Sequence, residues 1–147
     1  MFNWYRTSSH TLTSCKAHIV WCTKYRYKVL RWEVQIRCKE LIKQVCEYLD
    51  VVILKWVISW DHVHLMIEYP PKHSISDIVK RLKWKTSRML MQEYAEISKK
   101  YCWKHFWSVW YFCATSWNIT DDLIQDYLEH HRTWYDKIKD ENTFILE

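Results

Sequence analysis

Runs of β-branched and aromatic residues alternate along this chain with segments whose apolar positions follow the period of a helix. Residues 15–22, 51–58 and 62–69 are runs of the first kind, and each predicts a strand. Asp61 lies near the tight connection between the last two, so we expect these strands to pair antiparallel. The third strand ends at Pro70-Pro71, because proline cannot donate to the ladder.

Two other segments predict amphipathic helices. Residues 33–49 carry apolar side chains at helical spacing. A second helix begins after Ser74, where Ser-Ile-Ser-Asp resembles a capping box with aspartate in place of glutamate. A polar, Lys-rich connection follows, and a strand is expected near residues 106–115. Thr-Asp-Asp at 120–122 is typical of a helix start, with a capping hydroxyl and acids in the first turn.

The predicted order is strand, helix, strand, strand, helix, strand, helix. It matches the ferredoxin-like β-α-β-β-α-β layout, an α+β fold with an antiparallel sheet, plus an additional C-terminal helix. At 147 residues we expect a single domain, 1–147, with a core of about residues 10–132 and a charged tail over 133–147.

Charge and cysteine usage narrow the setting. Lys and Arg number 22 against 17 Asp and Glu, and this net charge of +5 permits binding to a polyanion without proving it. Six scattered cysteines form no C-x-x-C pair. No cleavable signal sequence opens the chain, and no apolar run approaches the length of a membrane span. We therefore expect a reduced, cytoplasmic protein with no membrane partner.

Glycine is absent, although a chain of this size would ordinarily hold roughly ten. Tryptophan, by contrast, occurs 11 times. Every turn that needs a positive φ must then be made by asparagine, aspartate or a strained residue.

The candidate chemistry centres on Asp61-His62-Val63-His64. Alternate side chains of a strand share a face, so His62 and His64 point together, about 6–7 Å apart, and can share a divalent ion. Two such histidines can also be partly exposed packing residues. Asp61 is placed to orient the site from outside the ligand shell, and the surrounding strand is apolar enough that paired imidazoles need partners. A third ligand must come from elsewhere.

Tyr127 and His131 stand four residues apart on the last predicted helix and so share a face. His131 can supply the third metal ligand, whereas His130 faces about 100° away. Tyr127 alone could be a core residue, but beside a metal ion its phenol becomes a possible nucleophile for a phosphate. We interpret the remaining histidines as structural or surface residues: His10, His18, His73 and His105.

Basic residues gather in two places, after the first strand and on the second helix. By default these are solvated surface, but aromatic residues among them (Tyr25, Tyr27 and Trp84) make a platform for single-stranded nucleic acid plausible. The candidate nucleic-acid-binding residues are Lys24, Arg26, Lys28, Lys80, Arg81, Lys83, Lys85 and Arg88.

The chain resembles the single-tyrosine HUH transposases (TnpA type) of prokaryotic insertion sequences that move as single-stranded DNA. The resemblance covers roughly residues 10–132. It rests on the stretches Cys15–Arg26 with Lys28–Leu30, Asp61–Leu65, Pro70-Pro71 with Ser74–Val79, Leu82-Lys83 with Ser87-Arg88, Phe106–Ser108, and Tyr127–His131.

The resemblance implies a DNA transposase that cleaves and rejoins single strands at hairpin-marked element ends through a 5′-phosphotyrosine. His62 and His64 would be metal ligands for Mg²⁺ or Mn²⁺, Tyr127 the nucleophile, and His131 the third ligand where the family often has glutamine. It also implies a homodimer, single-stranded DNA with hairpins as partner and no nucleotide cofactor. The alternative is a catalytically inactive or domesticated hairpin-binding protein of the same fold.

The departures from the family pattern are concentrated in tryptophan. The pattern leads us to expect glycine at or near Trp32, Trp84, Trp110 and Trp117, with Trp56 and Trp103 as further candidates. Trp21 and Trp107 fit the pattern as they stand. A systematic replacement of glycine by tryptophan would cost stability through overpacking and through lost positive-φ conformations.

Overall fold

The computed structural model describes residues 5–115. The chain divides into two compact units, Met1–Ser116 and Trp117–Glu147, and the structure described below belongs to the first. The single domain expected from the sequence stays a prediction, and the predicted C-terminal helix with Tyr127 and His131 lies outside the described residues.

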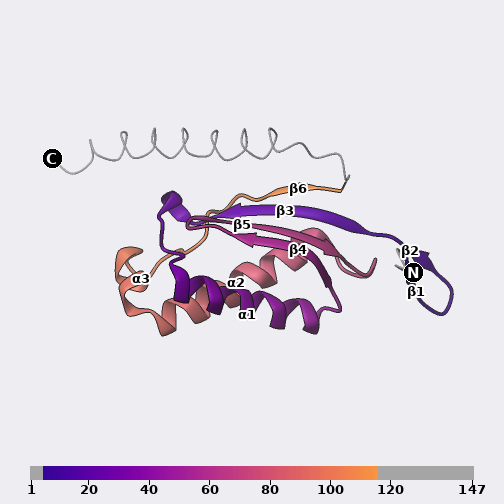
Figure 1. The fold of residues 1–147 in the computed structure, drawn as a ribbon, viewed down its shortest axis with the longest axis horizontal. Coiled ribbons are helices and arrows are strands. Elements are labelled where there is room, and N and C mark those ends of the chain that lie inside the picture. Colours follow the sequence, from indigo (N-terminus) through magenta and orange to yellow (C-terminus); the bar gives the residue numbers. More distant parts are fainter. Residues whose placement is uncertain (1–4, 116–147) are drawn as a thin grey trace. The chain divides into compact units, whose positions relative to one another are not determined.

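Four strands form the main sheet in the order β4-β5-β3-β6, and every neighbouring pair is antiparallel. Its strands are β3 (Lys16–Cys22), β4 (Val52–Ile58), β5 (His62–Glu68) and β6 (Phe112–Ala114). The long helices α1 (Trp32–Tyr48) and α2 (Ile75–Glu93) lie on one face of this sheet (Figure 1). This is the predicted ferredoxin-like arrangement, in which the first and third strands of the motif occupy the centre.

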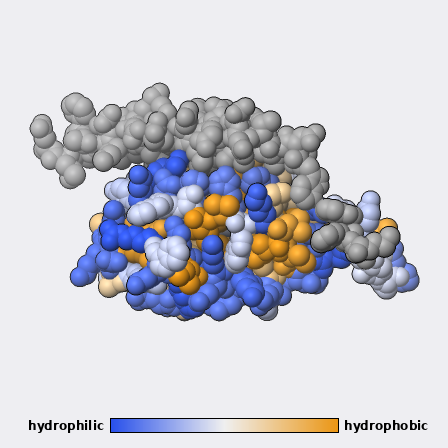
Figure 2. Space-filling model, in the orientation of Figure 1, coloured by the Kyte–Doolittle hydropathy of each residue, from blue (hydrophilic) through white to orange (hydrophobic). Residues whose placement is uncertain are grey.

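The core lies between the sheet and the two helices. Side chains of β3 and β5 alternate, so that Ile19 and Trp21 on β3 and Val63, Leu65 and Ile67 on β5 are all fully buried. Antiparallel pairing sets Leu65 opposite Ile19 and Val63 opposite Trp21, which makes one continuous apolar layer. Other apolar side chains reach the surface, where Figure 2 shows them as separate patches within a hydrophilic face.

The ends of the helices explain how a chain without glycine turns. After α1, Asp50 takes φ 57°, its amide binds the Glu47 carbonyl at 3.2 Å, and the Val51 amide binds the Cys46 carbonyl at 2.8 Å. This pattern is a Schellman C-cap with aspartate where glycine is usual.

The same cap follows the short helix α3 (Ala95–Lys100), where Cys102 and Trp103 take φ of 51° and 59°. The Trp103 amide binds the Ser98 carbonyl at 2.8 Å. Trp103 is one of the positions where glycine was expected, and its backbone adopts the conformation that favours glycine.

Three features differ from the sequence expectation. A two-stranded hairpin, β1 (Arg6–Thr7) with β2 (Leu12–Thr13), precedes the sheet, and α3 lies within the connection expected to be irregular. The strand expected near 106–115 is reduced to the three residues of β6. The segment before β6 still follows the edge of the sheet, since the Ser108 amide donates to the Cys22 carbonyl. The carbonyls of residues 108–110, however, accept hydrogen bonds from the Lys83 ammonium instead of from a neighbouring strand.

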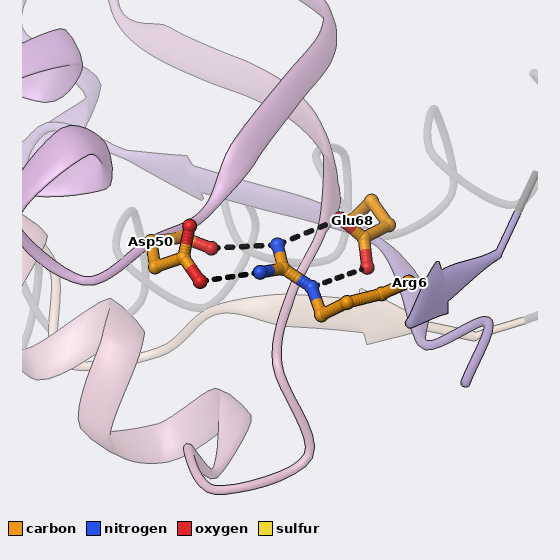
Figure 3. Close-up of polar contacts among 3 residues, drawn as sticks. All are labelled: Arg6, Asp50 and Glu68. Carbon is orange, nitrogen blue, oxygen red and sulfur yellow. Dashed lines mark hydrogen bonds and ion pairs between the residues drawn. The ribbon is translucent and has the colours of Figure 1, made fainter. Parts of the chain in front are cut away.

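The N-terminal hairpin is fastened to the sheet by Arg6 (Figure 3). Its guanidinium donates to both carboxylate oxygens of Glu68, at 3.0 and 2.9 Å, and to the side chain and carbonyl of Asp50. Glu68 is nearly buried, so this bidentate partner offsets the cost of placing a carboxylate there. Among residues 5–115, no helix is long and apolar enough to cross a lipid bilayer.

Candidate functional site

His62 and His64 lie on the face of β5 that points away from α1 and α2, because the alternate residues Val63 and Leu65 fill the core. Their ring centres are 5.0 Å apart, and the ring planes are inclined by 66°. The prediction that the two imidazoles share one face is therefore confirmed.

Asp61 precedes β5 and holds the first of these rings. Its Oδ1 lies 2.7 Å from Nδ1 of His62, while its Oδ2 accepts a hydrogen bond from Nε of Arg26 at 3.1 Å and forms an ion pair with Nη2 of Arg26 at 2.9 Å. Burial disfavours the charged carboxylate, but the hydrogen bond to His62 and the charge of Arg26 outweigh it, so the pKa of Asp61 lies below its ordinary value. The site thus contains an ionised aspartate in contact with a histidine.

This contact fixes which nitrogen of His62 can bind a ligand. With Nδ1 engaged by Asp61, Nε2 is the nitrogen of the ring that remains for a ligand, the arrangement that a carboxylate imposes on metal-binding histidines. Two imidazoles that share one ion through nitrogens at about 2.1 Å have ring centres roughly 5 Å apart. The separation of His62 and His64 fits that requirement without rearrangement of the strand.

His18 is a neighbour that sequence reasoning missed. It projects from β3 on the same face, and its ring centre is 5.6 Å from that of His64. The alternation of side chains along β3 places His18 on the face opposite the buried Ala17 and Ile19. The interpretation of His18 as a structural or surface residue did not take into account that β3 pairs with β5. Register between distant strands is the information that the single sequence lacks.

A third metal ligand is not supplied by the part of the chain that is described. No group of three or more histidine, cysteine, aspartate or glutamate residues within 5–115 could hold an ion. Cys22, opposite His62 on β3, is buried, and burial raises the pKa of its thiol to about 11, which leaves it protonated. His131 and Tyr127, the ligand and nucleophile expected from the sequence, lie outside the described residues.

A basic, aromatic turn follows β3. The ammonium of Lys24 lies 5.2 Å from the centre of the Tyr25 ring, and that of Lys100 lies 4.7 Å from the Tyr27 ring. Tyr25 and Tyr27 are themselves 5.4 Å apart, and Tyr25 is exposed. Cations beside partly exposed rings suit the stacking of unpaired bases and the contact of phosphates.

The basic residues of α2 divide into two groups. Lys80, Arg81 and Arg88 are exposed, and the Arg88 guanidinium lies 5.2 Å from the exposed ring of Trp84. Lys83 instead donates to the carbonyls of Ser108, Val109 and Trp110 at 2.7, 3.3 and 3.0 Å.

Burial lowers the pKa of Lys83 to about 8. Its ammonium is committed to the loop that leads into β6, and its place among nucleic-acid-binding residues stays a prediction. Lys28 is exposed and Lys85 half-buried.

The chain is similar in sequence to known proteins of one family. The family described as "Transposase IS200 like" matches residues 11–131 of the chain. The transposase for insertion sequence element IS200 of Salmonella typhimurium is 34% identical over 125 residues, which cover 85% of this chain and 82% of that protein. The ISDra2 transposase TnpA of Deinococcus radiodurans is 30% identical over 112 residues, covering 76% of this chain and 80% of its own length.

Solved structures agree on the fold. The crystal structure of a candidate transposase from Deinococcus radiodurans R1 superposes with a TM-score of 0.79 and 26% identity, over 85% of this chain and 96% of that one. A REP-associated tyrosine transposase bound to a REP hairpin gives a TM-score of 0.53 at 15% identity, over 85% of this chain and 67% of its own. The second likeness concerns the fold alone.

Proposed function

Because the chain belongs to the family of IS200-like transposases, we propose that it cleaves and rejoins single-stranded DNA at hairpin-marked element ends, through a divalent metal ion and a 5′-phosphotyrosine intermediate. The observation that carries the proposal is the pair His62 and His64, held on one face of β5 with Asp61 bound to the first ring. A sheet histidine used only for packing needs no such oriented partner.

His62 and His64 would hold the ion, with His131 as the third ligand in the position that the resemblance implies. The donor set consists of imidazole nitrogens, which departs from the oxygen ligands that Mg²⁺ prefers and favours Mn²⁺ over Mg²⁺. When bound, the ion would polarise the scissile phosphate and offset the charge that develops there.

Tyr127 would supply the nucleophile. Its phenolic oxygen forms a bond to phosphorus while the bond from phosphorus to the 3′ oxygen breaks. The proton lost by the phenol is balanced by the proton gained by the 3′-hydroxyl. The new phosphotyrosine stays on the 5′ end and retains the phosphodiester energy, so the reverse reaction joins another 3′ end without ATP or any nucleotide cofactor.

The DNA partner would be bound by the basic, aromatic turn after β3 and by the exposed cations of α2. Tyr25 and Tyr27 offer ring faces beside Lys24 and Lys100, as single-strand binding requires. We also propose a homodimer. The edge strand β4 carries three exposed apolar residues that a second copy could cover, namely Val52, Leu54 and Val57.

The test is the formation of a covalent protein–DNA adduct. Purified protein is incubated with hairpin-bearing single-stranded DNA and Mn²⁺ and then separated under denaturing conditions. The wild type should give an adduct and Tyr127→Phe none, while Tyr48→Phe, at an exposed tyrosine ending α1, should behave as wild type. Hairpin binding by folded protein with no adduct in any metal would reject the proposal and favour the binding-protein alternative.

A further inference from the structure

Arg26 lies in an unusual turn beside the metal-ligand pair. Tyr25 and Arg26, both within the short helical turn η1 (Lys24–Arg26), take φ of 61° and 54°. Two consecutive non-glycine residues in the left-handed region are unfavourable, and such conformations persist where surrounding contacts impose them.

The contacts that impose this turn converge on Asp61. The Thr23 amide binds the Asp61 carbonyl at 2.8 Å, and the Thr23 hydroxyl binds the Tyr27 carbonyl at 2.8 Å, which closes the turn. The Arg26 amide binds the Thr23 carbonyl at 3.0 Å. The backbone of the turn is therefore fastened to the residue whose side chain holds His62.

The Arg26 side chain reaches the same residue from the other side. Its Nε donates a hydrogen bond to Oδ2 of Asp61 and its Nη2 forms an ion pair with the same oxygen, which leaves Oδ1 for Nδ1 of His62. The side chains of Arg26 and Asp61 are only 18% and 14% exposed. One carboxylate thus connects a guanidinium to an imidazole, with a different oxygen for each.

We propose that Arg26 is a positioning residue for the metal ligand His62, acting through Asp61, and that phosphate contact is not its principal role. The inference rests on the proposed metal-binding role of His62. Without Arg26, the Asp61 carboxylate could rotate, and neither its orientation nor the tautomer of His62 would be fixed. The strained turn is then explained, because it is what brings the guanidinium to Asp61.

The location of the guanidinium separates this role from that of the exposed cations. Arg81 projects from α2 and is exposed, as a residue that scans a DNA backbone should be. Arg26 makes one hydrogen bond and one ion pair to the same carboxylate oxygen of Asp61 in a partly buried setting, where charge-assisted contacts are strong. Removing a group that orients a metal ligand typically lowers metal affinity about 10- to 100-fold.

The test compares Arg26→Gln with Arg81→Gln in full-length protein. Mn²⁺ affinity is measured by electron paramagnetic resonance, and hairpin DNA affinity by fluorescence anisotropy with EDTA present. Arg26→Gln should weaken Mn²⁺ binding at least about tenfold and change metal-free hairpin binding less than about twofold. Arg81→Gln should weaken hairpin binding and leave Mn²⁺ affinity unchanged. Weakened hairpin binding with unchanged Mn²⁺ affinity in Arg26→Gln would overturn the inference.

A second measurement does not depend on metal. In the metal-free protein, nitrogen-15 chemical shifts of the His62 ring report which of its nitrogens carries the proton. The wild type should carry its proton on Nδ1, and Arg26→Gln should show a mixture, with Arg26→Lys between them. An unchanged tautomer in folded Arg26→Gln would contradict the inference. A wild type that binds no Mn²⁺ would instead reject the proposed metal site, and the tautomer comparison would still test the role of Arg26.

A double-mutant cycle tests the route. If Arg26 acts through Asp61, then Arg26→Gln should have no further effect on Mn²⁺ affinity or on the His62 tautomer once Asp61→Asn is present. Additive effects of the two substitutions would contradict coupling through the carboxylate. Amide spectra of each variant establish that the sheet is folded.

Discussion

Replacing tryptophan by glycine should have opposite effects on stability at two exposed positions. Trp103 has φ 59° and is 67% exposed, so glycine there relieves a left-handed conformation while removing little buried surface. Relief of that conformation is worth about 1–2 kcal/mol, and the greater freedom of glycine in the unfolded chain costs about 0.5–1 kcal/mol. We expect Trp103→Gly to stabilise the fold by about 0.5–1 kcal/mol.

Trp84 provides the matched control. It lies inside α2 with 58% of its surface exposed, and the Arg88 guanidinium lies over its ring. Glycine inside a helix costs about 0.5 kcal/mol relative to tryptophan, and the lost cation–π contact costs about 0.5–1 kcal/mol more. Trp84→Gly should therefore destabilise the fold by about 1 kcal/mol, although the family pattern leads us to expect glycine there.

Urea denaturation measures both changes. The midpoint should rise in Trp103→Gly and fall in Trp84→Gly, with an unchanged slope in each. A fall in both would mean that the left-handed conformation at Trp103 carries no strain. A rise in both would mean that tryptophan is unfavourable at exposed positions whatever the backbone does.

Three other perturbations follow from the described contacts. Arg6→Gln should destabilise the protein by about 2 kcal/mol in a urea titration, because it leaves the nearly buried Glu68 without its bidentate partner. Arg37→Gln, which removes a more exposed ion pair with Glu93, should cost about 0.5 kcal/mol. Equal losses of stability would refute the distinction between the two ion pairs. Lys83→Met should weaken the protection of the Ser108 amide in hydrogen exchange, because the loop carbonyls lose their donor, and protection equal to wild type would count against the loop contact. Burial raises the pKa of the Cys38 and Cys46 thiols to about 12, which suppresses the reactive thiolate. Iodoacetamide at a pH near 8 should therefore label the exposed Cys102 first and these two cysteines only on unfolding, as measured by peptide mass spectrometry. Early labelling of Cys38 would contradict its burial.

Local patterns in the sequence predicted much of the fold. Strand alternation around Val63 and Leu65 placed His62 and His64 together, and the Ser74 cap is formed, since its hydroxyl accepts from the Asp77 amide. These features depend on neighbours within a few residues. A helix of six residues such as α3 spans fewer than two turns, so its apolar positions do not repeat often enough to reveal a helical period.

What the sequence did not reveal depends on contacts between distant residues. The sequence predicts Arg26 as a nucleic-acid-binding residue, and nothing local shows that a left-handed turn brings it to Asp61, 35 residues later. The shortening of β6 depends in the same way on Lys83, 25 residues before Ser108. Both cases involve a long cationic side chain whose partner is set by tertiary structure.

The most direct measurement of the central claim is mass spectrometry of the covalent DNA adduct formed in Mn²⁺. We predict that the peptide containing Tyr127 carries the 5′-phosphate of the cleaved strand, and that His62→Ala and His64→Ala each abolish this adduct while retaining hairpin binding. An adduct that forms equally well in both histidine variants, or that maps to a residue other than Tyr127, would contradict the account.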